Sequence, residues 1–364
     1  MRYGDAELTN IECRLREDAE DLFDDATVRW LAQAELTQYL PSGAAEEGEW
    51  LSRLPEALRR KVNPLAQLMA LAAPGCELRF RIQSGTARLK LRAGTRPRPN
   101  GVHPATIEVY QGCFQTAWHV VERKATTIEI VLPDNLALLQ EVSQREGLPY
   151  DAGLTRVVLP WEGPTQLIGL EGDIEPPHEG DVPARRMVSY GSSITHGALA
   201  IRPTGSWAWR LSDKLGVDRV NLGFGGGAHL EPEMADYIAE RQDWDLATLE
   251  LGINIVGTVT VDEFSERVAY FVPRIAQAHP DKWIFCVDLF RCAHSPENVA
   301  KIDAFREVVR RQVEALALPR LVHVPGEAML TSYDGLAGDL VHPSPAGMEE
   351  IATNMARVMR ERMG

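Results

Sequence analysis

The sequence of 364 residues has no apolar run that approaches the about 20 residues needed to cross a bilayer, which argues against a helical membrane protein. It is also short of positive charge, because 38 Lys and Arg face 52 Asp and Glu and leave a formal net charge of -14. A nucleic-acid surface needs clustered basic side chains to neutralise phosphates, so we expect no nucleic-acid partner. The composition, with 45% hydrophobic and 25% charged residues, is that of a soluble globular protein.

Cysteine is scarce as well, and no Cys-x-x-Cys pair occurs. The first residues are polar and acidic, without the basic start and apolar stretch of a secretory signal. An odd number of scattered thiols argues against a disulfide framework and against a structural zinc site. We therefore expect a cytoplasmic protein with reduced thiols and no metal. The five thiols are Cys13, Cys76, Cys113, Cys286 and Cys292.

Length and patterning predict two domains, residues 1–180 and 185–364, joined by a proline-rich linker at 174–183. Residues 50–72 have the apolar spacing of helical or irregular structure. Elsewhere in the first domain, apolar and polar residues alternate in short segments, which predicts an all-β sandwich of jelly-roll type. These segments are 77–82, 87–91, 106–110, 127–132, 157–160 and 166–170.

The second domain alternates buried strands with amphipathic helices, which predicts a parallel sheet in a three-layer α/β/α fold. Ligands in such sheets bind beyond the carboxyl ends of the strands. Strands are expected at 187–190, 219–222, 246–251, 283–289 and 321–324, and helices near 206–215, 230–240, 261–278, 297–316 and 346–361.

A serine lies where the first of these strands ends, in the turn Gly191-Ser192-Ser193. A free hydroxyl is a poor nucleophile and needs an adjacent base. His342 is a candidate base, because Asp339, three residues earlier, can accept the other ring proton and fix the tautomer. The alternative is that Asp339 and His342 form a surface turn that caps the last helix.

Acyl transfer also needs donors for the negative oxygen of the tetrahedral intermediate. The second strand ends in the bare run at 225–227, where backbone N–H groups can approach a ligand closely. Asn254 follows the third strand and can donate its amide to the same oxygen. The alternatives are a tight packing turn for the glycines and a helix cap or turn role for Asn254.

Four blocks, in this order, resemble those of the SGNH (GDSL-type) hydrolase family over residues 185–364. The resemblance implies a flavodoxin-like α/β/α fold and a mechanism that needs neither metal nor cofactor. It also implies that the first domain is similar to the N-terminal sandwich of a subgroup that contains carbohydrate esterases and a polyketide acyltransferase. The blocks are Gly191-Ser192-Ser193, the Gly226 region, Gly252-x-Asn254 and Asp339-x-x-His342.

The same resemblance assigns the site. Ser193 would be the nucleophile, His342 the general base and acid, and Asp339 the residue that orients the imidazole. The oxyanion hole would consist of the Ser193 and Gly226 N–H groups and the Asn254 side chain.

The sequence departs from the family at three places. Ser192 and Ile255 stand where many members have Asp, so any help from a carboxylate at Ser192 is expected to be absent. The run at 225–227 is unusually bare, which leaves open which of these glycines donates.

We expect an enzyme that acts through a Ser193 acyl-enzyme on a small-molecule acyl donor, with water or a hydroxyl as acceptor. Ester hydrolysis is favoured, O-acyl transfer to a sugar or polyketide is the alternative, and an inactive carbohydrate-binding protein ranks lower. A dinucleotide fingerprint at Gly223-x-Gly225-x-x-Ala228 is disfavoured because it leaves Ser193 and His342 unexplained. His196 is expected to be a loop or pocket residue. The sequence does not reveal the acyl group or the oligomeric state.

Overall fold

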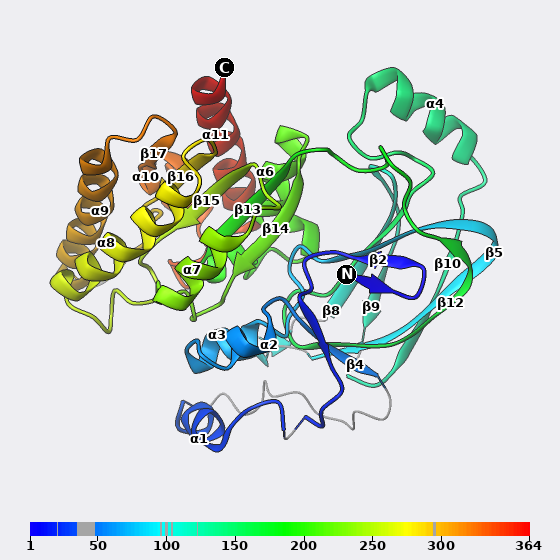
Figure 1. Ribbon diagram of the computed structural model, residues 1–364, viewed down its shortest axis with the longest axis horizontal. Coiled ribbons are helices and arrows are strands. Elements are labelled where there is room, and N and C mark those ends of the chain that lie inside the picture. Colours follow the sequence, from blue (N-terminus) through cyan, green and yellow to red (C-terminus); the bar gives the residue numbers. More distant parts are fainter. Residues whose placement is uncertain are drawn as a thin grey trace.

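The computed structural model describes residues 1–364 except 20, 35–47, 95–96, 99–100, 103–104, 122 and 294–295. Two large sheets organise the described residues: a ten-stranded antiparallel sheet formed before residue 176 and a five-stranded parallel sheet formed after residue 185 (Figure 1). Among the described helices, none combines the length and the apolar composition required to span a bilayer.

The parallel sheet has the strand order β14-β13-β15-β16-β17. This is the doubly wound order in which the chain starts near the centre and reverses direction once, so that a crevice opens beside the first strand at the carboxyl edge. The expected strands are confirmed. They are β13 (Arg186–Gly191), β14 (Asp218–Gly223), β15 (Leu246–Glu250), β16 (Trp283–Val287) and β17 (Leu321–Val324).

Helices cover both faces of this sheet and bury separate apolar layers. One layer comes from α7, α8 and α9 and the other from α6 and α11, as the two clusters of buried residues show. Gly216 in the left-handed region ends α6, and a Thr260–Glu263 capping box begins α8. All five expected helices are present: α6 (Trp207–Leu215), α7 (Pro232–Glu240), α8 (Val261–Ala278), α9 (Pro296–Leu316) and α11 (Pro345–Met363).

The antiparallel sheet is built around one long strand, β5 (Glu77–Ala93). Residues 77–80 of this strand pair with β11 and in part with β2, residues 81–93 pair with β12, and residues 86–91 also pair with β10. The other strands are β1 (Arg2–Tyr3), β2 (Ala6–Leu8), β3 (Cys13–Leu15), β4 (Glu49–Ser52), β8 (Ala105–Gln111), β9 (Phe114–Val121), β10 (Thr126–Val131), β11 (Thr155–Val158) and β12 (Thr165–Glu175), and β6 (Pro97–Arg98) pairs separately with β7 (Gly101–Val102).

Two features of this N-terminal part differ from the expectation. The segments 77–82 and 87–91 form one strand, because Ser84 pairs with Asp173 of β12 and carries the ladder across the join, with a register shift on each side of that pair. The part also contains helices: α1 (Asp25–Gln33) and α4 (Leu136–Glu146) were not expected, whereas α2 (Glu56–Arg59) and α3 (Pro64–Met69) lie in the segment expected to be helical or irregular.

A buried charged cluster joins the two parts beside the beginning of β14. The Arg79 guanidinium lies 2.6 Å from Asp218, and Arg156 lies 2.5 Å from Glu77. Arg219 of β14 in turn lies 3.3 Å from Glu77. Because single buried charges are costly, this mutual pairing ties the antiparallel sheet to the parallel one.

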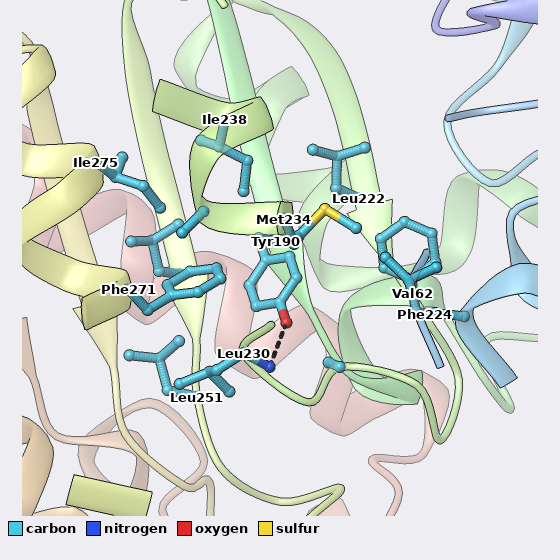
Figure 2. Packing of buried hydrophobic residues seen from close by; sticks show 14 of the residues in the cluster. Val62, Tyr190, Leu222, Phe224, Leu230, Met234, Ile238, Leu251, Phe271 and Ile275 are labelled. Atoms are coloured by element: carbon cyan, nitrogen blue, oxygen red, sulfur yellow. Dashed lines mark hydrogen bonds between the residues drawn. The ribbon is translucent and has the colours of Figure 1, made fainter. Parts of the chain in front are cut away.

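An apolar layer crosses the same boundary closer to the carboxyl edge of the sheet. Val62, next to α3, packs in one cluster with Leu222 and Phe224 at the end of β14 (Figure 2). The same view shows the Tyr190 hydroxyl accepting a hydrogen bond from the Leu230 N–H at 3.1 Å. The end of β14 and the loop after it are therefore packed from both the N-terminal part and the sheet.

Candidate active site

The candidate nucleophile stands at the first position of a very short helix, α5 (Ser193–His196), directly after β13. The Ser192 hydroxyl caps this helix by accepting a hydrogen bond from the Ile194 N–H at 3.0 Å. Gly191 is required for close approach, because a Cβ there would lie 2.4 Å from an oxygen of Glu250. The turn thus presents the Ser193 side chain at the carboxyl edge of the sheet, while only 8% of the residue is exposed.

Three side chains from opposite ends of the α/β part meet in a hydrogen-bonded chain. The Ser193 Oγ lies 2.7 Å from His342 Nε2. The other ring nitrogen, His342 Nδ1, lies 2.7 Å from Asp339 Oδ2. This is the order of contacts that lets a carboxylate fix an imidazole tautomer and lets the imidazole accept a hydroxyl proton.

Local structure holds the acid and the imidazole in this orientation. Partial burial opposes ionisation of Asp339, but the N–H groups of His342 and Val341 donate to its carboxylate and keep its pKa below the usual value. Leu340, which lies between Asp339 and Val341, adopts φ +58°, a left-handed conformation that closes the turn. The residue that caps α11 is Ser344, so the alternative in which Asp339 and His342 cap the last helix is not what the structure shows.

Residues 224–231 form the loop after β14, which we call the glycine loop. It begins beside the nucleophile turn, because the Phe224 N–H donates to the Gly191 carbonyl at 2.8 Å. The Gly227 N–H is occupied by the Phe224 carbonyl at 2.9 Å, whereas those of Gly225 and Gly226 donate to none of the described residues. Gly226, at φ +75°, therefore stays a candidate for an oxyanion donor. Gly227 is excluded, because its N–H is already bonded to Phe224.

Asn254 contacts the glycine loop directly. Its Oδ1 accepts a hydrogen bond from the Ala228 N–H at 3.1 Å. Since an N–H can bond only to the oxygen of the amide, this contact fixes which end of the side chain faces the loop and leaves the NH₂ group to point elsewhere. Asn254 does not cap the following helix, because Thr260 occupies that position in α8.

Sequence reasoning missed Glu250, the last residue of β15, which lies under the nucleophile turn. Its carboxylate accepts hydrogen bonds from the Ser192 N–H and hydroxyl, at 2.8 Å and 2.7 Å, and from the Thr195 hydroxyl at 2.8 Å. Only 2% of the residue is exposed, and no basic side chain among the described residues forms an ion pair with it. Burial raises the pKa of Glu250, against the opposing effect of the hydrogen bonds from Ser192 and Thr195.

A carboxylate therefore lies beside the nucleophile turn although residue 192 is serine, because Glu250 provides it from the neighbouring strand β15. The signal in the sequence was a single charge inside the apolar run Leu246-Ala247-Thr248-Leu249-Glu250-Leu251. Such a strand is buried on both faces, where an acid must find hydrogen-bond donors.

His196 and the two tryptophans of α6 have structural contacts. His196 is buried, with Nδ1 3.1 Å from the Gly223 carbonyl and Nε2 2.5 Å from the Trp161 carbonyl. Trp207 and Trp209 are both buried, and Trp209 lies under the Arg219 guanidinium at 3.6 Å. In the described part of the chain, no group of three or more His, Cys, Asp or Glu side chains is placed to hold a metal ion.

Comparison with known proteins defines the class. Residues 184–360, which span the α/β part of the chain, match the GDSL-like Lipase/Acylhydrolase family. The protein is accordingly an enzyme that acts on esters, by hydrolysis or acyl transfer. A search of curated protein sequences found no match.

Solved structures with the same fold extend over both parts of the chain. The salicylyl-acyltransferase SsfX3 from a tetracycline biosynthetic pathway is 19% identical, with a TM-score of 0.70 over 87% of this chain and 91% of that one. A GDSL-like lipase from Bacteroides ovatus is 20% identical, with a TM-score of 0.67 over 87% and 93%. A family two carbohydrate esterase from Clostridium thermocellum, solved with cellohexaose, is 16% identical, with a TM-score of 0.54 over 80% and 94%.

Proposed function

We propose that this chain is a serine esterase that hydrolyses carboxylic esters of small, carbohydrate or polyketide alcohols through an acyl-enzyme on Ser193. The observation that carries the proposal is the unbroken chain of contacts from Ser193 through His342 to Asp339, each 2.7 Å long. A hydroxyl within hydrogen-bond reach of an imidazole that is itself oriented by a carboxylate has the geometry of an activated nucleophile.

The reaction has two halves that use the same groups. His342 Nε2 accepts the Ser193 proton as Oγ attacks the ester carbonyl, and the protonated imidazole then gives that proton to the leaving alcohol. Water then attacks the acyl-enzyme and loses a proton to His342, which returns that proton to the Ser193 Oγ as the acyl–oxygen bond breaks and the acid leaves. The Ser193 N–H, the Gly226 N–H and the Asn254 amide would hold the negative oxygen in both halves.

The Ser193 N–H is well placed for this role. It belongs to the first residue of α5, and the first N–H groups of a helix have no acceptor within the helix. The Ser192 peptide N–H before it is already held by Glu250. None of the described residues accepts a hydrogen bond from the Ser193 N–H, and the preceding Gly191–Ser192 peptide is held by Glu250.

A second candidate is an O-acyltransferase that passes the acyl group to a hydroxyl of a sugar or polyketide. The observation that favours it is the similarity to the salicylyl-acyltransferase, which covers 87% of this chain and so includes the N-terminal part. The catalytic groups would be the same, and exclusion of water from the acyl-enzyme would decide between the two acceptors.

We also propose that residues 1–180 form a β-sandwich accessory domain and residues 185–364 the catalytic domain. The antiparallel sheet lies entirely before residue 176 and the parallel sheet after residue 185, which supports this division. β5 supports the sandwich, because residues 77–80 pair with β11 whereas the rest of the strand pairs with β12 and β10.

The test measures hydrolysis of p-nitrophenyl acetate by wild type, Ser193→Ala and His342→Ala. Each substitution is expected to lower kcat by about 10³-fold or more, because the triad residues act as a unit. Ser189→Ala is a matched control, since it removes a buried hydroxyl on β13 that contacts Thr248 rather than the site. Near-normal turnover by either site variant would overturn the assignment.

Two further measurements separate the alternatives. Mass spectrometry of the products, with a candidate hydroxyl acceptor present, distinguishes free acid from acylated acceptor. Labelling of Ser193 by a fluorophosphonate distinguishes an enzyme from an inactive binding protein, because only an activated serine reacts.

A further inference from the structure

The glycine loop is packed against the N-terminal part of the chain, at the segment that contains α3. Resting on the proposed function, we propose that Asn63, at the start of α3, is a positioning residue for the oxyanion donor of the glycine loop. The N-terminal part would then be built into the catalytic centre and not serve only as an appended binding module.

Asn63 holds the glycine loop at two points. Its Nδ2 donates to the Gly227 carbonyl at 2.8 Å and to Glu231 Oε1 at 2.5 Å. Its backbone N–H also donates to Glu231 Oε1, at 3.2 Å. Gly227 lies next to the candidate donor Gly226, and Glu231 is where the loop enters α7. One side chain from the N-terminal part therefore contacts the loop both beside the donor and at its far end.

The bare glycines allow α3 to come this close. A Cβ on Gly227 would lie 2.5 Å from the backbone nitrogen of Ala66, and a Cβ on Gly226 would lie 2.9 Å from Leu65 Cδ1. At Gly227 the clash is with the backbone of α3, so a side chain there would push α3 away from the loop. At Gly226 the left-handed φ of +75° already favours glycine. The packing of α3 therefore accounts for the glycine at 227, which catalysis alone would not require.

A buried arginine secures the approach to the loop from the same side. Arg53, 1% exposed, donates to the carbonyls of Asn221 and Gly223 at the end of β14, at 2.8 Å and 3.0 Å. It also donates to the Met69 carbonyl at the end of α3, at 2.7 Å. The guanidinium thus ties α3 to the strand that leads into the glycine loop.

These contacts fix the loop on both sides of Gly226. A donor acts on the transition state only if its N–H is aimed at the position of the oxyanion, and a displacement of about 1 Å can cost about 10²-fold in rate. Loosening the loop should therefore lower kcat and leave KM nearly unchanged, because ground-state binding of the ester does not depend on this donor.

The experiment compares Asn63→Ser with Asn10→Gly. Serine keeps the cap of α3, since its hydroxyl can replace the Asn63 Oδ1 that accepts from the Ala66 N–H, but it is too short to reach Gly227. Asn10 is the matched control: its Nδ2 also bridges the two parts, to the Gly75 and Arg219 carbonyls, but far from the glycine loop. Glycine suits its φ of +58°. A second test variant, Leu65→Ala, removes only the side chain that lies on Gly226.

Three readouts are taken: kcat and KM on p-nitrophenyl acetate, the thermal midpoint, and hydrogen–deuterium exchange of peptides covering residues 224–231. We expect Asn63→Ser to lower kcat about tenfold, Leu65→Ala to lower it less, and both to exchange faster in the loop. We expect Asn10→Gly to resemble wild type in kcat and in loop exchange.

The proposal is overturned if Asn63→Ser keeps kcat within twofold of wild type, or if Asn63→Ser and Asn10→Gly lose kcat equally. Faster loop exchange with unchanged kcat also overturns it, because the loop would then be held by α3 without setting the rate. Failure of the proposed function has a different signature: turnover by wild type would not depend on Ser193, whatever the behaviour of Asn63→Ser.

Discussion

Replacing Asn254 tests the oxyanion hole most sharply, because the contact that its side chain makes and the role that we propose for it involve different atoms. Its Oδ1 holds the Ala228 N–H at 3.1 Å, and its NH₂ group is the proposed donor to the oxyanion. Asn254→Ala removes both. Loss of one oxyanion donor costs about 3–4 kcal/mol, or about 10²–10³-fold in kcat. Loss of the bond to Ala228 costs about 1 kcal/mol of stability.

Asn254→Asp separates the bond to Ala228 from the proposed donation to the oxyanion. Aspartate keeps an oxygen for the Ala228 N–H, so its free energy of unfolding should stay closer to that of wild type than that of the alanine variant. It replaces the donor with a negative oxygen that faces the developing charge, so its kcat should fall at least as far as that of Asn254→Ala. The assay is kcat on p-nitrophenyl acetate together with urea denaturation. A kcat for Asn254→Ala within threefold of wild type would refute the reasoning.

Three further predictions concern the acids. Asp339→Asn should lower kcat about 10²-fold or more across the pH range, because an amide can stabilise the wrong tautomer of His342; steady-state kinetics measures this. Burial raises the pKa of Glu250. The free energy of unfolding of wild type, compared with that of Glu250→Gln, should therefore fall as pH rises from the usual glutamate range through the raised pKa. Urea titrations at several pH values measure this difference. Burial opposes ionisation of Glu77, but Arg156 and Arg79 hold its pKa well below the usual range. The ionised carboxylate therefore stabilises the fold at neutral pH, and this stabilisation is lost as pH falls toward the lowered pKa. Glu77→Gln should cost about 3–5 kcal/mol of unfolding free energy at pH 7, and urea denaturation at several pH values should show that the variant lacks this part of the acid sensitivity.

The α/β part of the fold could be predicted from the sequence almost element by element. Its strands are short apolar runs and its helices have clear amphipathic spacing, so local pattern and tertiary structure agree. The break predicted between 82 and 87 was wrong, because Ser84-Gly85 is a turn signal that β5 overrides by pairing Ser84 with Asp173 of β12. Sheet pairing depends on partners distant in sequence, which no local pattern contains.

In the candidate site, too, residues in local sequence patterns could be predicted, and residues that act through distant contacts could not. Ser193, Asp339 and His342 stand out because each lies in a short, recognisable block after a strand or before a helix. Glu250 and Asn63 do not, because they act on Ser192 and Gly227 across contacts formed only in the folded chain. Their roles could not have been predicted without the register of β15 beside β13 and the position of α3 on the glycine loop.

The proposed mechanism forms a covalent intermediate at Ser193, and rapid-quench mass spectrometry with p-nitrophenyl acetate detects it directly. We expect an acetyl group on the peptide that contains Ser193 in wild type, and none at that position in Ser193→Ala. Steady ester turnover without acetylation of Ser193, undiminished in Ser193→Ala, would contradict it.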